Sequence, residues 1–277
     1  MSKRRVVLLC VLAFVLCALV VVVPYALRLQ EGSTVGVEDS EQELTDVADS
    51  SVDEEELAPE PVVEELEEQE DVLPDAVSIE VPFISQAPNG EWNLPDFQDA
   101  CEEASVLMAA AWLRGETVKP APAQARQQIE ELIAWQQTRG RYTLDLSTED
   151  TNALLQDYTG YVDTEVRVVE VADDLRRELA KGNILILPMN GAVLPSPFYT
   201  APGPERHMLV VSGYTADGGF VTQDPGTVTK GEDYVFAASD FVASIRDFPS
   251  GYHAPITRTD KLMIVVRPAD SPVGGFE

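Results

Sequence analysis

The chain has 277 residues, with 48 Asp and Glu against 19 Lys and Arg, and a formal net charge of −29 at pH 7. Such a negative protein is repelled by a phosphate backbone, so nucleic acid is not expected as a partner. Two histidines and three cysteines lack the ligand spacing of a zinc site, and no metal or organic cofactor is expected.

The N-terminal segment has the pattern of a membrane anchor. Lys3, Arg4 and Arg5 precede an unbroken apolar run from Val6 to Val23, which continues to Leu27. That run is about the 20 residues that a helix needs to cross a bilayer, and basic residues before it place the N-terminus in the cytosol. A cleaved signal peptide is the alternative, but its apolar region is typically about 7 to 15 residues long. Residues 1–30 are therefore interpreted as an uncleaved anchor, with residues 6 to 27 in the cell membrane.

The next segment, residues 31–75, contains nineteen Asp and Glu and no Lys or Arg. Like charges repel and few apolar residues are available for burial, so this segment is predicted to be a disordered linker. The linker carries −19 and the first thirty residues carry +4, which leaves −14 of the total −29 for residues 76–277. That last part is long enough for one globular domain, which the anchor would hold outside the cytosol.

The periodicity of the remaining chain predicts helices first and strands afterwards. A strand over residues 77–84 and a polar loop lead to a helix that begins near Cys101 and ends near Gly115. The further elements are predicted as helices over 123–137, 147–159 and 173–180, and strands over 164–169, 184–187, 208–214, 220–223, 234–237 and 262–266. This order indicates an α+β fold, with an N-terminal helical part packed on an antiparallel sheet.

Cys101 is the one cysteine of this domain, and it stands where a helix begins. A helix N-terminus stabilises a thiolate and lowers the pKa of a cysteine. Asp99 and Glu102 have the spacing of a capping pair, which would put Cys101 in the first helical turn. Both acids oppose a low pKa of the thiol, so activation requires a histidine. The alternative is that Cys101 is a buried small hydrophobe, as free cysteines often are.

His207 is the stronger of the two histidine candidates. It opens the apolar run of residues 208–211, whereas His253 lies in a loop with no strand leading into it. A turn then leads to Asp224 in Asp-Pro-Gly, a sequence that is also common in plain turns. With residues 217 and 218 at the centre of a hairpin, residue 211 would oppose Asp224, which puts His207 four residues from Asp224 along the ladder. That is too far for a hydrogen bond, so a bulge, a strong twist or a shifted turn must bring the two together.

Four motifs in this order resemble a known family: residues 81–86 (VPFISQ), 101–105 (CEEAS), 207–214 (HMLVVSGY) and 224–226 (DPG). Over nearly all of residues 77–268 the chain resembles the peptidase family C thirty-nine-like domain, related to papain-like enzymes that process bacteriocin precursors at double-glycine sites. The resemblance implies a papain-like fold with Cys101 as nucleophile, His207 as general base and acid, Asp224 as the orienting carboxylate and Gln86 as oxyanion donor. Gln98, three residues before the cysteine, is the alternative donor.

Two departures limit what this resemblance implies. No phosphate-binding Gly-rich loop of a transporter is present, so cleavage of double-glycine leaders is not expected. Glu102 stands where the processing enzymes usually have glycine. The sequence therefore predicts a membrane-anchored extracytoplasmic cysteine peptidase with peptide or protein substrates. The alternatives are an inactive papain-like binding domain, and a cell-wall peptide amidase or transpeptidase with the same triad.

Overall fold

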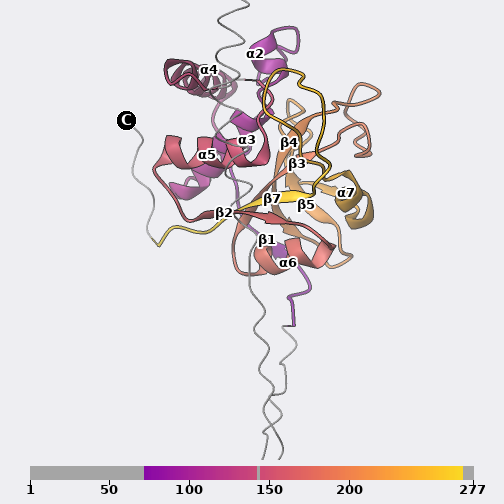
Figure 1. Cartoon of the computed structure of the whole chain (residues 1–277). Helices are drawn as coiled ribbons and strands as arrows, with labels where there is room; N and C mark the ends of the chain where they lie inside the picture. Colours follow the sequence, from indigo (N-terminus) through magenta and orange to yellow (C-terminus); the bar gives the residue numbers. More distant parts are fainter. Residues whose placement is uncertain (1–71, 142–143, 271–277) are drawn as a thin grey trace, which may run out of the picture. The chain divides into compact units, whose positions relative to one another are not determined.

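The computed structural model describes residues 72–141 and 144–270 (Figure 1). The predicted anchor and all but the last four residues of the predicted linker lie outside this part. Within the described part, none of the helices combines the length and apolar character that a membrane crossing requires.

Helices dominate the first half of the described chain. They are α2 (Pro95–Gln98), α3 (Cys101–Leu113), α4 (Pro122–Thr138) and α5 (Thr148–Thr159), preceded by the short strand β1 (Val77–Ser78). The second half contains β2 (Thr164–Val168), α6 (Ala172–Ala180), β3 (Ile184–Met189), β4 (His207–Tyr214), β5 (Phe220–Gln223), β6 (Tyr234–Phe236), α7 (Ala238–Ser244) and β7 (Leu262–Val266).

All the described strands join one antiparallel sheet. The strand order is β2-β7-β3-β4-β5-β6, and β1 pairs with the end of β4. The predicted α+β class with an antiparallel sheet is therefore confirmed. Connections between neighbouring strands are mostly local, but β7, from the C-terminal end, inserts between β2 and β3.

The two faces of the sheet bury two separate apolar layers. Ile184, Ile186, Val210 and Ile264 pack in one cluster with residues of α3, α4 and α5. The alternate strand residues, among them Leu185, Leu187, Leu209, Val211 and Val265, pack on the other face with residues of α6 and α7. Successive side chains of a strand point to opposite faces, which is why strands covered on both sides appear as continuous apolar runs. In Figure 1, α3 and α5 lie above strands β2 and β7, and α6 lies below them.

Three elements differ from the sequence prediction. The strand predicted over residues 77–84 is limited to Val77–Ser78, since after the bond from the Ile79 N–H to the Ser212 carbonyl the chain leaves the ladder, and Pro82 has no N–H to donate. The helices α2 and α7 were not predicted, because four and seven residues are too short to show a helical period.

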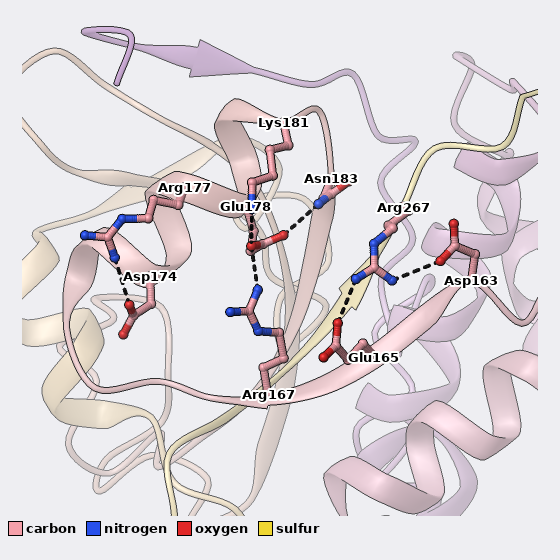
Figure 2. Close-up of polar contacts among 9 residues, drawn as sticks. All are labelled: Asp163, Glu165, Arg167, Asp174, Arg177, Glu178, Lys181, Asn183 and Arg267. Carbon is pink, nitrogen blue, oxygen red and sulfur yellow. Dashed lines mark hydrogen bonds and ion pairs between the residues drawn. The ribbon is translucent and has the colours of Figure 1, made fainter. Parts of the chain in front are cut away.

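A buried carboxylate joins α6 to strand β2 and to the turn before β3, on the face away from Cys101. Glu178 of α6 is only 3% exposed and accepts hydrogen bonds from Arg167 of β2 (2.6 Å), Lys181 (2.8 Å) and Asn183 (2.8 Å) (Figure 2). Burial alone raises the pKa of Glu178, but the bonds from Lys181 and Asn183 and the nearby positive charges outweigh it and lower the pKa. The carboxylate therefore remains ionised and holds the α6–β3 turn against β2.

Replacing Glu178 by alanine is expected to lower the free energy of unfolding by about 3 kcal/mol, because it leaves the buried amide of Asn183 without its partner and opens a small cavity. Glu165→Ala is the matched control. Glu165 pairs with Arg267 on an exposed strand surface, and such pairs contribute about 0 to 1 kcal/mol. Urea unfolding measures both variants. Equal, small effects for the two would show that Glu178 is not structurally important.

Candidate active site

The helix α3 carries Cys101 as its first residue, and it is held from all sides. Every residue of α3 except Trp112 is buried, and the helix contacts β4, α4 and α5. Apart from Glu102, Glu103 and Ser105 near its start, the helix is apolar all round, as expected of a helix in a core. The thiol is therefore fixed at the end of a helix that has almost no freedom to move.

The prediction that Asp99 and Glu102 cap this helix is wrong. The N-cap residue is Ala100 without a side-chain cap, and the N–H of Asp99 instead closes α2 by bonding to the carbonyl of Pro95. Glu102 turns inward, where one carboxylate oxygen accepts from the N–H of Leu146 (3.1 Å) and the other lies 3.2 Å from the Cys101 sulfur. The short α2, which was not predicted, explains the difference, because it uses the Asp99 amide.

His207 and Asp224 meet at the ends of β4 and β5. Near the turn Tyr214 pairs with Phe220, and after a bulge between Val211 and Gly213 the ladder continues with Val210 opposite Gln223. Continued by one step, this register puts Asp224 two residues from His207 instead of the four expected from a simple hairpin. The His207 Nε2 and Asp224 Oδ1 atoms are 2.7 Å apart. The bulge and shifted turn that the sequence required for this contact are thus present.

The Asp224 carboxylate is fully enclosed and has three partners. Besides His207, the hydroxyl of Tyr199 donates to Oδ2 (2.7 Å) and the N–H of Gly226 donates to Oδ1 (2.9 Å). Burial alone raises the pKa of Asp224, but the imidazole and these two donors outweigh it and hold the pKa below its usual value. A side chain at position 226 would meet the His207 ring at 2.9 Å, so this turn requires glycine. Asp224 is therefore both a turn residue and the ionised partner of the imidazole.

The geometry leaves one nitrogen of His207 available. Because Nε2 faces Asp224, Nδ1 is the ring nitrogen that remains for another partner. Cys101 and His207 line the same cleft, and the main-chain N–H of Met208, the next residue after His207, bonds to the Cys101 sulfur. The end of β4 thus contacts the thiol directly.

The thiol is protonated in this arrangement. Burial, and then the charge of Glu102 and its hydrogen bond with the thiol, raise the pKa of Cys101 well above its ordinary value, and Glu103 adds to the effect. The predicted opposition to a low pKa is confirmed for Glu102, whereas the second acid that raises the pKa of the thiol is Glu103 and not the predicted Asp99. Formation of a thiolate therefore depends on transfer of the proton to a base.

The two candidate amide donors lie at the same cleft but differ in their bonding. Gln86 is buried, and its Nε2 donates to the carbonyls of Phe97 (3.2 Å) and Gln98 (2.6 Å), which uses both N–H bonds. Gln98 is exposed, and its side-chain amide takes part in no hydrogen bond with the described residues. The main-chain N–H of Cys101, at the first position of α3, has no intrahelical partner. Gln86 must therefore give up one of its two hydrogen bonds to donate to a substrate. The Gln98 side-chain amide and the Cys101 N–H need not give up a hydrogen bond with the described residues.

The cleft has a volume of about 940 Å³, and Cys101 and His207 lie in its wall. Trp92, Phe198 and Val228 are exposed apolar residues on its lining. His253, the histidine set aside in the sequence analysis, also borders the cleft but lies in a loop and stacks on Tyr252. In residues 72–141 and 144–270 no cluster of three or more His, Cys, Asp or Glu side chains is arranged to hold a metal ion.

Tyr199 is a site residue that the sequence did not reveal. It belongs to a proline-rich loop, residues 194–204, in which no local pattern distinguishes one side chain from the others. Its ring packs edge-on against His207 at 5.5 Å, and burial followed by the Asp224 charge raises its pKa well above the ordinary value, so the hydroxyl stays a donor.

Tyr199→Phe is expected to reduce kcat/KM about tenfold while the fold stays intact, because one charge-assisted hydrogen bond to Asp224 is lost and the carboxylate orients the imidazole less firmly. The pH–rate profile supplies the second readout. Loss of the donor raises the pKa of Asp224, so the acidic limb moves to higher pH. An unchanged profile together with unchanged kcat/KM would contradict this role.

Comparison with known proteins gives the family. The chain has no match among curated protein sequences. It is similar to a crystal structure described as a C39-like peptidase from Bacillus anthracis, with 13% identity and a TM-score of 0.42, over 70% of this chain and 99% of that chain. The model of the Peptidase_C39 like family matches residues 78–246, which include Gln86, Cys101, His207 and Asp224. Since this match covers more than half of the sequence, the chain belongs to the Peptidase_C39 like family.

Proposed function

We propose that this protein is a cysteine peptidase that hydrolyses peptide bonds through a triad of Cys101, His207 and Asp224. The observation that carries the proposal is the buried His207–Asp224 contact of 2.7 Å, which leaves Nδ1 as the free ring nitrogen on the cleft that Cys101 also lines. Membership of a peptidase family supports a peptide or protein as the substrate.

The proposed reaction starts with proton transfer from the Cys101 thiol to His207 Nδ1. The thiolate adds to the carbonyl carbon of the scissile bond, and the oxyanion is stabilised by the N–H of Cys101 and a side-chain amide, for which Gln86 and Gln98 are the two candidates. The imidazolium then gives its proton to the leaving amine, and the carbon–nitrogen bond breaks. Water, deprotonated by the same imidazole, releases the acyl group from sulfur. Asp224 stays ionised throughout and fixes the ring orientation.

We further propose that residues 6 to 27 anchor the protein in the cell membrane with the peptidase domain on the extracytoplasmic side. The support is the sequence pattern of basic residues, apolar run and acidic linker. Protease accessibility of the domain in intact cells, compared with cells that have been opened, measures this orientation. Protection of the domain in intact cells would contradict it.

Cleavage of a peptide library by the full chain in water enriched in ¹⁸O tests the activity. Hydrolysis places one ¹⁸O atom in each new C-terminal carboxylate, which mass spectrometry detects, and Cys101→Ala is expected to remove all new products. Added glycinamide separates the alternatives, because a transpeptidase transfers the acyl group to the amine in preference to water. Binding of peptides without any hydrolysis product, and without any transfer product when glycinamide is present, would support the inactive binding domain and overturn the proposal.

A further inference from the structure

Two consecutive glutamates of α3 are buried beside the proposed nucleophile, and the reaction described above uses neither. Glu102 and Glu103 are each only 1% exposed. Lys and Arg side chains of the described residues form no ion pair with either one. Buried carboxyl groups without a cation are costly when ionised, so their retention next to a thiol requires an explanation.

The contacts of the two glutamates differ in one important respect. Glu102 lies 3.2 Å from the Cys101 sulfur through Oε2 and accepts from the Leu146 N–H through Oε1. Glu103 instead accepts from the Gln136 amide of α4 (2.6 Å). The two side chains share a helix turn, burial and charge, but only Glu102 bonds to the thiol.

The groups that face Glu102 decide how its charge acts. On α3 these are the Cys101 thiol and the Glu103 carboxyl, and from the segment before α5 it is the Leu146 N–H. Burial, followed by the charge of Glu103, raises the pKa of Glu102 to about 8. Glu102 therefore changes its protonation state close to neutral pH, where a cysteine peptidase with this triad would work.

We propose that Glu102, when ionised, is a hydrogen-bond acceptor that keeps the proton on the Cys101 thiol and away from His207, and thereby sets the fraction of reactive thiolate. This inference rests on the proposed function only in taking Cys101 as the nucleophile. With Glu102 ionised, the S–H bond points to the carboxylate and the thiolate is disfavoured by the adjacent negative charge. With Glu102 protonated, its O–H donates to sulfur, and the thiol proton that moves to His207 Nδ1 leaves a stabilised thiolate.

The arrangement gives the enzyme a built-in pH response. As the pH rises and Glu102 loses its proton, the Cys101 thiol becomes harder to ionise. The reactivity of Cys101 therefore increases less steeply with pH than the reactivity of a simple thiol. Removal of the Glu102 charge is therefore expected to lower the pKa of the Cys101 thiol.

The test compares Glu102→Gln with Glu103→Gln in the full chain. The second-order rate of alkylation by iodoacetamide is measured from pH 5.5 to 10 and quantified on the peptide that contains Cys101, because Cys10 and Cys17 also carry thiols. The amide at position 102 can still accept from Leu146 and can donate to sulfur. A fall of about one pKa unit, reduced by the lower nucleophilicity of a more acidic thiol, predicts a threefold to tenfold faster rate at pH 9, where Glu102 is ionised, and little difference at pH 6, where it is protonated.

The expected result is this acceleration in Glu102→Gln, with Glu103→Gln within about twofold of the unsubstituted protein. Equal rates for all three proteins, or equal acceleration in both variants, would overturn the inference, because only Glu102 contacts the thiol. If Glu102→Gln does not fold, Glu102→Met makes the same comparison with an uncharged side chain of similar shape. A His207→Ala series run in parallel separates the two proposals: an unchanged rate there contradicts the triad and leaves the Glu102 comparison valid.

Discussion

His207→Ala is expected to lower kcat/KM for peptide cleavage by about 10² to 10⁴, the usual contribution of a general acid–base residue. The physical reason is that burial and the charge of the neighbouring Glu102 both raise the pKa of the Cys101 thiol. Without the imidazole the thiol proton has no acceptor on the substrate side of the cleft, and the leaving amine has no donor. Steady-state kinetics on any peptide cleaved by the full chain measures the effect.

The chain provides a matched control for this substitution. His253 borders the same cleft, but its ring stacks on Tyr252, and within the described part of the chain only its main-chain N–H, not its imidazole, bonds to a carboxylate, that of Asp145. His253→Ala is therefore expected to change kcat/KM by no more than a few fold. A large loss for His253→Ala with little loss for His207→Ala would show that His253 is the catalytic base, and this would contradict the triad.

The second large effect is a loss of stability with rising pH that originates in the two buried glutamates. Burial is the first cause in both cases, and it raises the pKa of Glu102 to about 8 and that of Glu103 to about 7, from an ordinary value of 4.5. Between the ordinary value and the folded value, the native state holds a proton that the unfolded state has lost. Stability therefore falls as the pH rises through this window, by about 1.4 kcal/mol per pH unit for each group.

Glu103→Gln tests this directly, because its amide oxygen can still accept from Gln136 while its charge is gone. At pH 4.5 the variant and the unsubstituted protein are expected to have nearly equal stability, and at pH 8 the variant is expected to be at least about 2 kcal/mol more stable. Urea unfolding at a series of pH values gives the difference curve, in which the slopes from groups that do not interact with Glu103 cancel and the coupled Glu102 contributes to the remainder. A difference that does not grow with pH would show that Glu103 is not protonated in the folded protein at neutral pH.

The sequence predicted the main elements because most have clear local patterns. The apolar runs of β4, β5 and β7 and the helical spacing of α4 appear within one or two residues of their predicted ends. The separation of strand residues into two buried layers was not predictable, because a run that is apolar at every position hides which residues face which helices.

The site was predictable in its residue types and less so in its contacts. Cys101, His207 and Asp224 stand at the ends of regular elements, which is where the pattern of the sequence is most informative. The Tyr199 hydroxyl and the inward turn of Glu102 depend on contacts across 25 and 44 residues, respectively, which no local pattern contains. The same holds for Gln86, whose amide bonds are made to carbonyls of the unpredicted helix α2.

The most direct test of the central claim is the covalent intermediate itself. The full chain is mixed with a p-nitrophenyl ester, quenched in acid within milliseconds to seconds, and analysed by intact mass and peptide mapping. Our account predicts one acyl group per molecule, carried by Cys101, with a burst of nitrophenolate that slows strongly in His207→Ala. No acyl group on Cys101, or equal acylation of Cys101 with and without His207, would contradict it.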